Sequence, residues 1–187
     1  HAIESYLSLN ASAITDSLAI GAIKLIVRAL PKAYANPSNL QAREDMATAS
    51  LMAGMAFGNA GVGAVHALAY PLGARYNIAH GVSNALLLPH VMHWNKMACF
   101  ERMQDIAEAM GVKTAHLSVT QAADKAVEAM TELCAAVEIP SDLRSFGVPE
   151  EAIATMAVEA AGIERLMRNN PRKLNAVDIE KIYRAAY

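Results

Sequence analysis

Residues 49–91 read ASLMAGMAFGNAGVGAVHALAYPLGARYNIAHGVSNALLLPHV, and this stretch decides the fold. Its first part belongs to an apolar helical pattern over residues 40–57, in which alanine and glycine allow another helix or a ligand to approach closely. On this helix we expect the larger apolar side chains to point inward: Met46, Leu51, Met52 and Met55. The stretch therefore predicts tightly packed helices with small residues at their contacts.

Proline is expected to end two of the helices. Pro71 should stop a helix over residues 61–69, followed by a loop over 73–79 and a new helix over 81–93, and Pro31 should end the apolar run that begins near Ile14. Further helical patterns cover residues 2–9, 101–110, 120–137 and 178–187. We find no strand pattern, repeat or internal boundary. The sequence thus predicts an all-α, irregular multi-helix bundle that forms a single domain over residues 1–187.

Composition narrows the classes of function. The chain has 187 residues, of which 54% are hydrophobic and 18% charged, and its formal net charge is -2. This charge gives no electrostatic reason to expect binding to nucleic acid or to a membrane surface. Charges such as Lys24 and Arg28 interrupt the apolar runs, so no transmembrane helix is expected. Cys99 and Cys134 are expected to be reduced thiols, which favours a cytoplasmic protein.

Histidine is the residue type that points to chemistry. We expect three of the six histidines to lie on helix surfaces: His90, His93 and His116. His66 and His80 flank the predicted turn and can face one point, although such a pair is more often buried with ordinary hydrogen bonds. His1 adds a third imidazole from a separate segment. Three such ligands suit Fe(II) or Zn(II) and leave a coordination position for a substrate oxygen.

Three blocks of sequence resemble the iron-containing (group III) alcohol dehydrogenase family: HAIESYLS at residues 1–8, the stretch at 49–91, and NNPRKLNAVDIEKIYRAAY at 169–187. The resemblance covers essentially the whole chain. It implies a dehydroquinate synthase-like helical C-terminal domain, with an α/β dinucleotide-binding domain that precedes it and is absent from this sequence. A helical pattern already running at Ala2 and Ile3, without a capping residue, also indicates a piece of a longer protein.

The resemblance also implies a divalent metal, Fe(II) or Zn(II), held by an aspartate and three histidines. Carried over position by position, the histidines are His1, His66 and His80. The aspartate would lie one helical turn before His1, outside the sequence. NAD or NADP would be bound mainly by the missing domain.

Two further positions carry expectations from the family. Many relatives have a second histidine in an HPLG motif, four residues after the middle ligand, where this chain has Tyr70 in YPLG. Tyr70 should still face the site and can hydrogen-bond a substrate hydroxyl, but a phenol is a poorer base than an imidazole at neutral pH. Phe57 matches a position that lines the substrate channel. The alternatives are that Tyr70 only packs and that Phe57 is an ordinary core residue.

The function implied is that of an NAD(P)-dependent alcohol dehydrogenase, which interconverts a small alcohol and an aldehyde or ketone by hydride transfer. The family also implies a homo-oligomer. The helical chain alone should be inactive because it lacks the dinucleotide site and one ligand. Two alternatives remain open: a sister enzyme of the same fold, such as a glycerol dehydrogenase or maleylacetate reductase, and a non-catalytic helical module that binds a metal or a partner.

Overall fold

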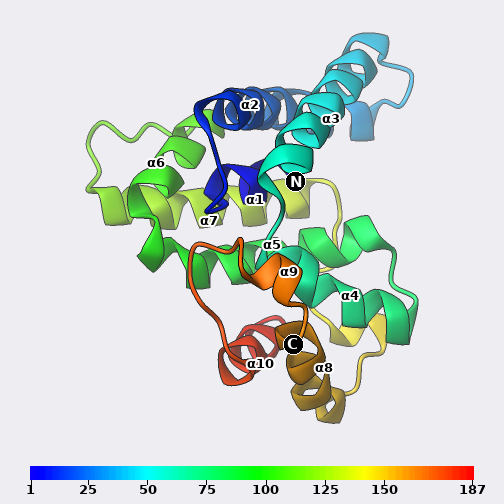
Figure 1. The fold of residues 1–187 in the computed structure, drawn as a ribbon. Helices are drawn as coiled ribbons and strands as arrows, with labels where there is room; N and C mark the ends of the chain where they lie inside the picture. Colours follow the sequence, from blue (N-terminus) through cyan, green and yellow to red (C-terminus); the bar gives the residue numbers. More distant parts are fainter.

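The computed structural model describes residues 1–187 and consists of helices and loops, with no strand (Figure 1). This confirms the predicted all-α class. The elements are α1 (Ala2–Leu7), α2 (Ala13–Ala35), α3 (Leu40–Ala60), α4 (Ala64–Tyr76), α5 (His80–Asn95), η1 (Lys96–Ala98), α6 (Phe100–Ala109), α7 (Val119–Ala136), η2 (Arg144–Phe146), η3 (Glu150–Ala152), α8 (Ile153–Ala161), α9 (Glu164–Met167) and α10 (Ala176–Ala185).

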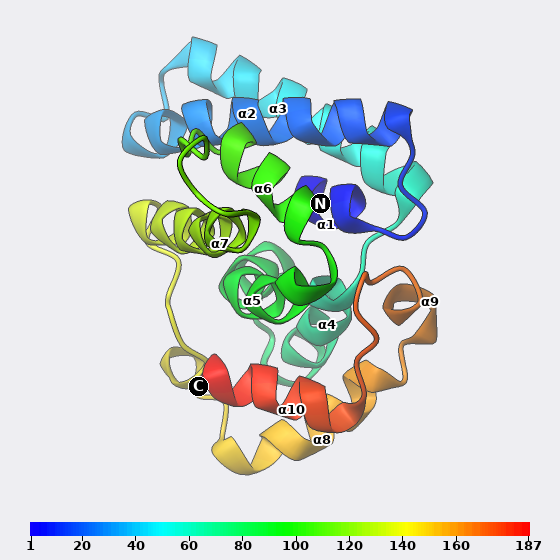
Figure 2. The same ribbon diagram turned by 90° about the vertical axis from the view of Figure 1, so that its left-hand side faces the viewer.

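The helices are stacked in layers around α5. Helices α2 and α3 lie side by side at one end of the molecule, and α8 and α10 lie at the other (Figure 1). Figure 2 shows α5 end-on near the centre, with α4, α7 and α10 packed around it. A single cluster of 37 buried residues extends from α1 to α10. The site residues on α1, α4 and α5 are therefore supported by one continuous core.

Local sequence signals explain where several helices begin. Ser12, Ser118 and Asn175 each accept a hydrogen bond from a backbone N–H three residues later, at the starts of α2, α7 and α10. In each case the side chain of that later residue accepts a hydrogen bond from the backbone N–H of the capping residue. Two otherwise unpaired backbone donors are therefore satisfied. These starts agree with the sequence patterns to within a few residues.

Both predicted proline stops are wrong. Pro31 lies inside α2, which continues to Ala35, and Pro71 lies inside α4, which continues to Tyr76. A proline removes one helical hydrogen bond, but Ala33 and Leu72 beyond the two prolines are buried in the core. Burial of these residues stabilises the turns that follow. The loop before His80 therefore contains only residues 77–79.

The expected inward face of α3 is also partly wrong. Its buried residues are alanines at positions 42, 49, 53, 56 and 60, whereas Met46 and Met52 are half-buried. Leu51 is 64% exposed and Met55 is 43% exposed. Alanine faces the neighbouring helices because α3 packs closely against α2 and α1. Leu51 and Met55 consequently lie on the outer face, whereas Met52 packs against the core.

The junction between α3 and α4 positions the start of α4. The chain bends by 104° between the two helices. Together they are long and apolar enough to cross a membrane, but no single helix is. Gly61 has a φ of 78° and a ψ of 174°, a conformation open essentially to glycine. Asn169 Nδ2 donates to the carbonyl of Val62, and Asn170 Oδ1 accepts from the amide of Ala64. The loop before α10 thus holds the first turn of α4.

Substitution of Gly61 by alanine is expected to destabilise the protein by about 1–3 kcal/mol. The added Cβ would lie 2.5 Å from Asn169 Nδ2, in a backbone conformation that strains any side chain. Urea unfolding measures the loss. Gly58→Ala is the matched control, because an added Cβ there meets nothing within 4 Å and the site is helical. Equal stabilities of the two variants would contradict the prediction.

Candidate metal centre

Three histidines from separate segments meet at one point. His1 precedes α1, His66 lies in the first turn of α4, and His80 is the first residue of α5. One nitrogen from each ring lies within 4.8 Å of the others. The ring centroids of His1 and His66 are 4.7 Å apart, and those of His66 and His80 are 5.2 Å apart. The three rings border a cavity of about 260 Å³. The structure therefore brings together the histidines that the sequence singled out.

Glu4 fixes the orientation of His66. This carboxylate is buried, with 3% of its side chain exposed. Its Oε1 accepts hydrogen bonds from the backbone N–H groups of Gly63 at 3.1 Å and Val65 at 2.7 Å, and its Oε2 pairs with His66 Nδ1. A carboxylate at Nδ1 favours the tautomer that carries its proton there, which leaves Nε2 with a free lone pair. His66 is thus prepared to act as a ligand through Nε2.

The remaining nitrogen of His66 tests whether a metal fits. Nε2 is buried and has no hydrogen-bond partner. A buried polar atom without a partner is rare, because its desolvation is not compensated. A divalent ion between the three rings would satisfy this lone pair, and imidazole nitrogens suit Fe(II) and Zn(II). A carboxylate behind the metal-binding imidazole is the usual support for such a ligand. The donor set therefore fits a borderline divalent metal.

The surroundings of His80 favour the neutral form that ligation requires. Partial burial, followed by the nearby His66, lowers the pKa of His80 below its usual value near 6.5. The side chain of Asn84, one turn further along α5, donates to the His80 carbonyl at 2.8 Å and lies 3.3 Å from both ring nitrogens. The Oδ1 atom of Asn84 is buried and unpaired, which adds a second free acceptor beside the three rings.

Phe57 and Tyr70 lie against this cluster. The ring of Phe57 stacks on His1 with centroids 4.2 Å apart and an interplanar angle of 16°. The ring centroid of Tyr70 is 6.2 Å from that of His80, so Tyr70 faces the site as the helical spacing predicts. The Tyr70 hydroxyl accepts a hydrogen bond from Arg165 at 2.9 Å. Phe57 thus packs on one ligand ring, and Tyr70 borders another.

Sequence analysis did not identify two residues of the site, Glu4 and Arg165. Glu4 follows His1 by three residues, a spacing that places both on one side of α1, and this was an available signal. Its partners at the start of α4 are distant in sequence, so only the fold reveals that Glu4 contacts His66. Arg165 gave no signal, because α9 is a four-residue helix that the sequence patterns did not predict.

The other predicted surface histidines do not join the cluster. His93 and His116 are exposed, whereas His90 is half-buried, and burial together with nearby His93 lowers the pKa of His90. The two cysteines are free, with Cys99 buried and Cys134 half-buried. Burial raises the pKa of the Cys99 thiol to about 11. Burial also raises the pKa of the Cys134 thiol, so neither thiol is poised as a nucleophile at neutral pH.

Comparison with known proteins identifies the family. The model of the Fe-containing alcohol dehydrogenase family, C-terminal, matches residues 1–187. Long-chain-alcohol dehydrogenase 1 of Geobacillus thermodenitrificans is 49% identical over 100% of this chain and 47% of its own length. The 1,3-propanediol dehydrogenase of Klebsiella pneumoniae is 49% identical over 100% of this chain and 48% of its own length.

A solved structure agrees with the sequence relatives. The crystal structure of a 1,3-propanediol oxidoreductase superposes with a TM-score of 0.98 at 49% identity, covering 100% of this chain and 49% of that one. The chain spans about half the length of the curated relatives it matches. Sequence, fold and the meeting of the three histidines lead to one assignment. The chain belongs to the Fe-containing alcohol dehydrogenase family and corresponds to its C-terminal, all-helical part.

Proposed function

We propose that this chain is the metal-binding half of an NAD(P)-dependent alcohol dehydrogenase, with His1, His66 and His80 as metal ligands. The observation that carries the proposal is the buried, unpaired Nε2 of His66, which lies among three imidazoles and is oriented by Glu4. Family membership supports the same reading. A bound Fe(II) or Zn(II) would supply a Lewis acid that polarises the oxygen of an alcohol or carbonyl.

The residues around the three histidines orient a ligand, line the substrate site and transfer a proton. Glu4 holds the proton on His66 Nδ1 and so keeps the ring fixed and neutral towards the metal. Phe57 provides an apolar wall beside His1, suited to the carbon chain of a substrate and to the exclusion of water. Tyr70 Oη hydrogen-bonds the substrate hydroxyl, and in alcohol oxidation it accepts the hydroxyl proton while its own phenolic proton passes to solvent. Arg165 orients this phenol.

The substrate is an alcohol or the corresponding aldehyde or ketone, and the relatives reported above are named for a long-chain alcohol and for 1,3-propanediol. NAD or NADP binds mainly to an α/β domain contributed by the rest of the protein, and Fe(II) is the favoured metal. We place the enzyme in the cytoplasm because its two thiols are free. Leu51 and Met55 on the outer face of α3 are exposed apolar groups suited to contact with that domain or with another copy in a homo-oligomer.

The test uses the full-length protein, prepared without oxygen and loaded with Fe(II) or Zn(II). We expect NAD- or NADP-dependent oxidation of at least one alcohol in a panel of primary alcohols and diols, lost with a chelator and restored by the metal. Residues 1–187 alone should show no such activity. Light scattering of the full-length protein should show an oligomer. A metal-loaded, folded protein that oxidises none of the alcohols, or an active fragment, would overturn the proposal.

Replacement of Tyr70 by phenylalanine in the full-length enzyme is expected to lower kcat by about 10²-fold at neutral pH, the scale of a lost acid–base group. Metal content should be unchanged, because Tyr70 is not a ligand. Tyr70→His should restore activity and move the limiting ionisation to lower pH, since an imidazole has a reference pKa of about 6.5 against about 10 for a phenol. Unchanged kcat in Tyr70→Phe would assign Tyr70 a packing role only.

A further inference from the structure

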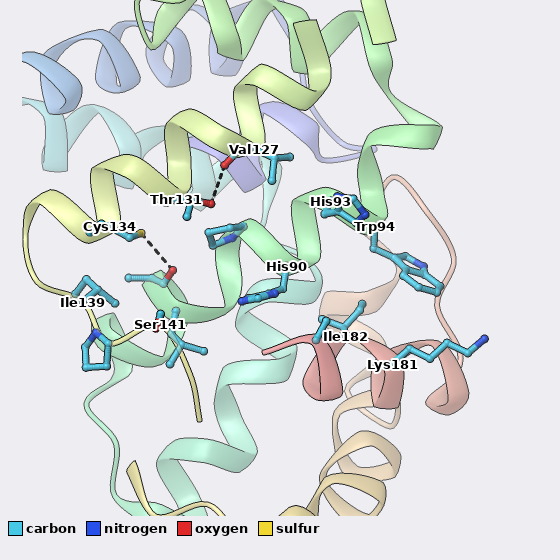
Figure 3. Close-up of a pocket in the computed structure, with 16 residues that line it drawn as sticks. His90, His93, Trp94, Val127, Thr131, Cys134, Ile139, Ser141, Lys181 and Ile182 are labelled. Atoms are coloured by element: carbon cyan, nitrogen blue, oxygen red, sulfur yellow. Dashed lines mark hydrogen bonds between the residues drawn. The ribbon is translucent and has the colours of Figure 1, made fainter. Parts of the chain in front are cut away.

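A second cavity lies between α5, α7 and α10, away from the three histidines (Figure 3). Its volume is about 570 Å³, within the usual range of roughly 300–1,000 Å³ for small-molecule sites. His90, in its lining, follows His80 by ten residues on α5, which corresponds to about 15 Å along the helix. Ala85 borders both this cavity and the one at the metal centre, but none of the three clustered histidines lines the second cavity.

The two ends of this cavity differ in chemistry. Figure 3 shows Trp94 and Lys181 near one end, and Ile139, Ser141 and Cys134 near the other. Most of the lining is apolar, and no aspartate or glutamate borders the cavity. The Cys134 thiol already donates to the carbonyl of Ala85. A ligand would consequently meet apolar groups along most of its length and hydrogen-bond donors near Trp94.

The donors near Trp94 have no partner within the chain. The indole nitrogen Nε1 of Trp94 is buried and makes no hydrogen bond. An unmade hydrogen bond of this kind costs about 1–3 kcal/mol. Lys181 Nζ lies 5.9 Å from the centroid of the Trp94 ring and forms no ion pair. An acceptor with negative charge would satisfy both groups, whereas a cation would be repelled by Lys181 and could not accept from Trp94.

Arg172 strengthens the positive field at this end. Its guanidinium carbon lies 4.6 Å from the centroid of the Trp94 ring, and its Nη1 donates to the Trp94 carbonyl. His90 contributes no opposing negative charge. Two cationic side chains thus lie near the Trp94 ring, and one of them, Lys181, borders the cavity.

We propose that this cavity binds a small carboxylate with an apolar chain. The carboxylate accepts from Trp94 Nε1 and pairs with Lys181, and the chain lies along Val127, Ile139 and Ile182. Charge-assisted hydrogen bonds of this type are stronger than neutral ones. The site is independent of the metal centre and of the proposed dehydrogenase activity, so it is tested by binding alone.

Trp94 supplies a direct readout, because it is the only tryptophan in the chain. We expect titration of the chain with decanoate, below its aggregation range, to change the tryptophan fluorescence saturably. Lys181→Met should weaken binding by about tenfold, and Lys181→Arg should largely preserve it. Ala135→Phe, at an exposed position of the lining, should block entry without disturbing the core. Methyl decanoate, which lacks the charge, should bind more weakly.

Lys173→Met is the matched control, because Lys173 is an exposed lysine outside the cavity lining. It should bind decanoate as the unmodified chain does, and circular dichroism should show that every variant is folded. Saturable binding that distinguishes Lys181→Met from Lys173→Met supports the proposal. Absence of a saturable change, or equal effects of the two lysine substitutions, overturns it.

Discussion

Replacement of His66 by asparagine is expected to abolish tight binding of Fe(II) or Zn(II) while leaving the fold intact. An asparagine Nδ2 occupies nearly the position of the imidazole Nδ1 and can still donate to Glu4, but it provides nothing at the position of Nε2. The affinity should fall by more than the roughly 10–100-fold loss caused by mutation of an outer partner of a ligand. Calorimetric titration with Zn(II), and with Fe(II) under nitrogen, measures the change.

His116→Ala controls for nonspecific histidine binding, because His116 is exposed and lies outside the cluster. Its affinity should equal that of the unmodified protein. The unfolding free energy of His66→Asn, measured without metal, should stay within about 1 kcal/mol, because the buried hydrogen bond to Glu4 is kept. Tight binding that survives in a folded His66→Asn variant would remove His66 from the ligand set.

Glu4→Ala is expected to destabilise the metal-free protein by about 3–5 kcal/mol. The substitution leaves the amides of Gly63 and Val65 and the Nδ1 of His66 without their shared acceptor. All three groups face a buried region, so water does not replace the carboxylate at no cost. Urea unfolding measures the loss, with Glu101→Ala as the control, because Glu101 is an exposed glutamate in the first turn of α6.

Glu4→Gln separates orientation from folding. One amide oxygen remains to accept from the backbone, but the amide nitrogen is a donor and no longer favours the proton on His66 Nδ1. Metal affinity should fall by about 10–100-fold. The visible spectrum of the Co(II)-loaded variant should also change, because the ligand ring is no longer held in place. A Glu4→Gln variant with unchanged affinity and spectrum would reduce Glu4 to a purely structural role.

Local sequence accounted for most of the helices, because capping residues and helical periodicity are short-range signals. The choice of His1, His66 and His80 depended on the family resemblance as well as on their positions in the sequence. Local sequence failed at Pro31 and Pro71, where burial of the following turn outweighs one lost hydrogen bond. It also failed for Leu51 and Met55, because close packing of α3 depends on neighbours that periodicity alone does not identify. The link from Glu4 to His66 spans 62 residues and exists only in the folded chain.

Helix α1 couples metal binding to local folding. It begins directly after His1 and carries Glu4. It is held by Tyr6, whose hydroxyl donates to Asp105 and whose carbonyl accepts from Arg102. A metal ion that binds only when α1 is folded slows amide exchange in α1 in proportion to the occupancy of the metal site. The rate of hydrogen exchange in α1 is therefore a local gauge of metal occupancy.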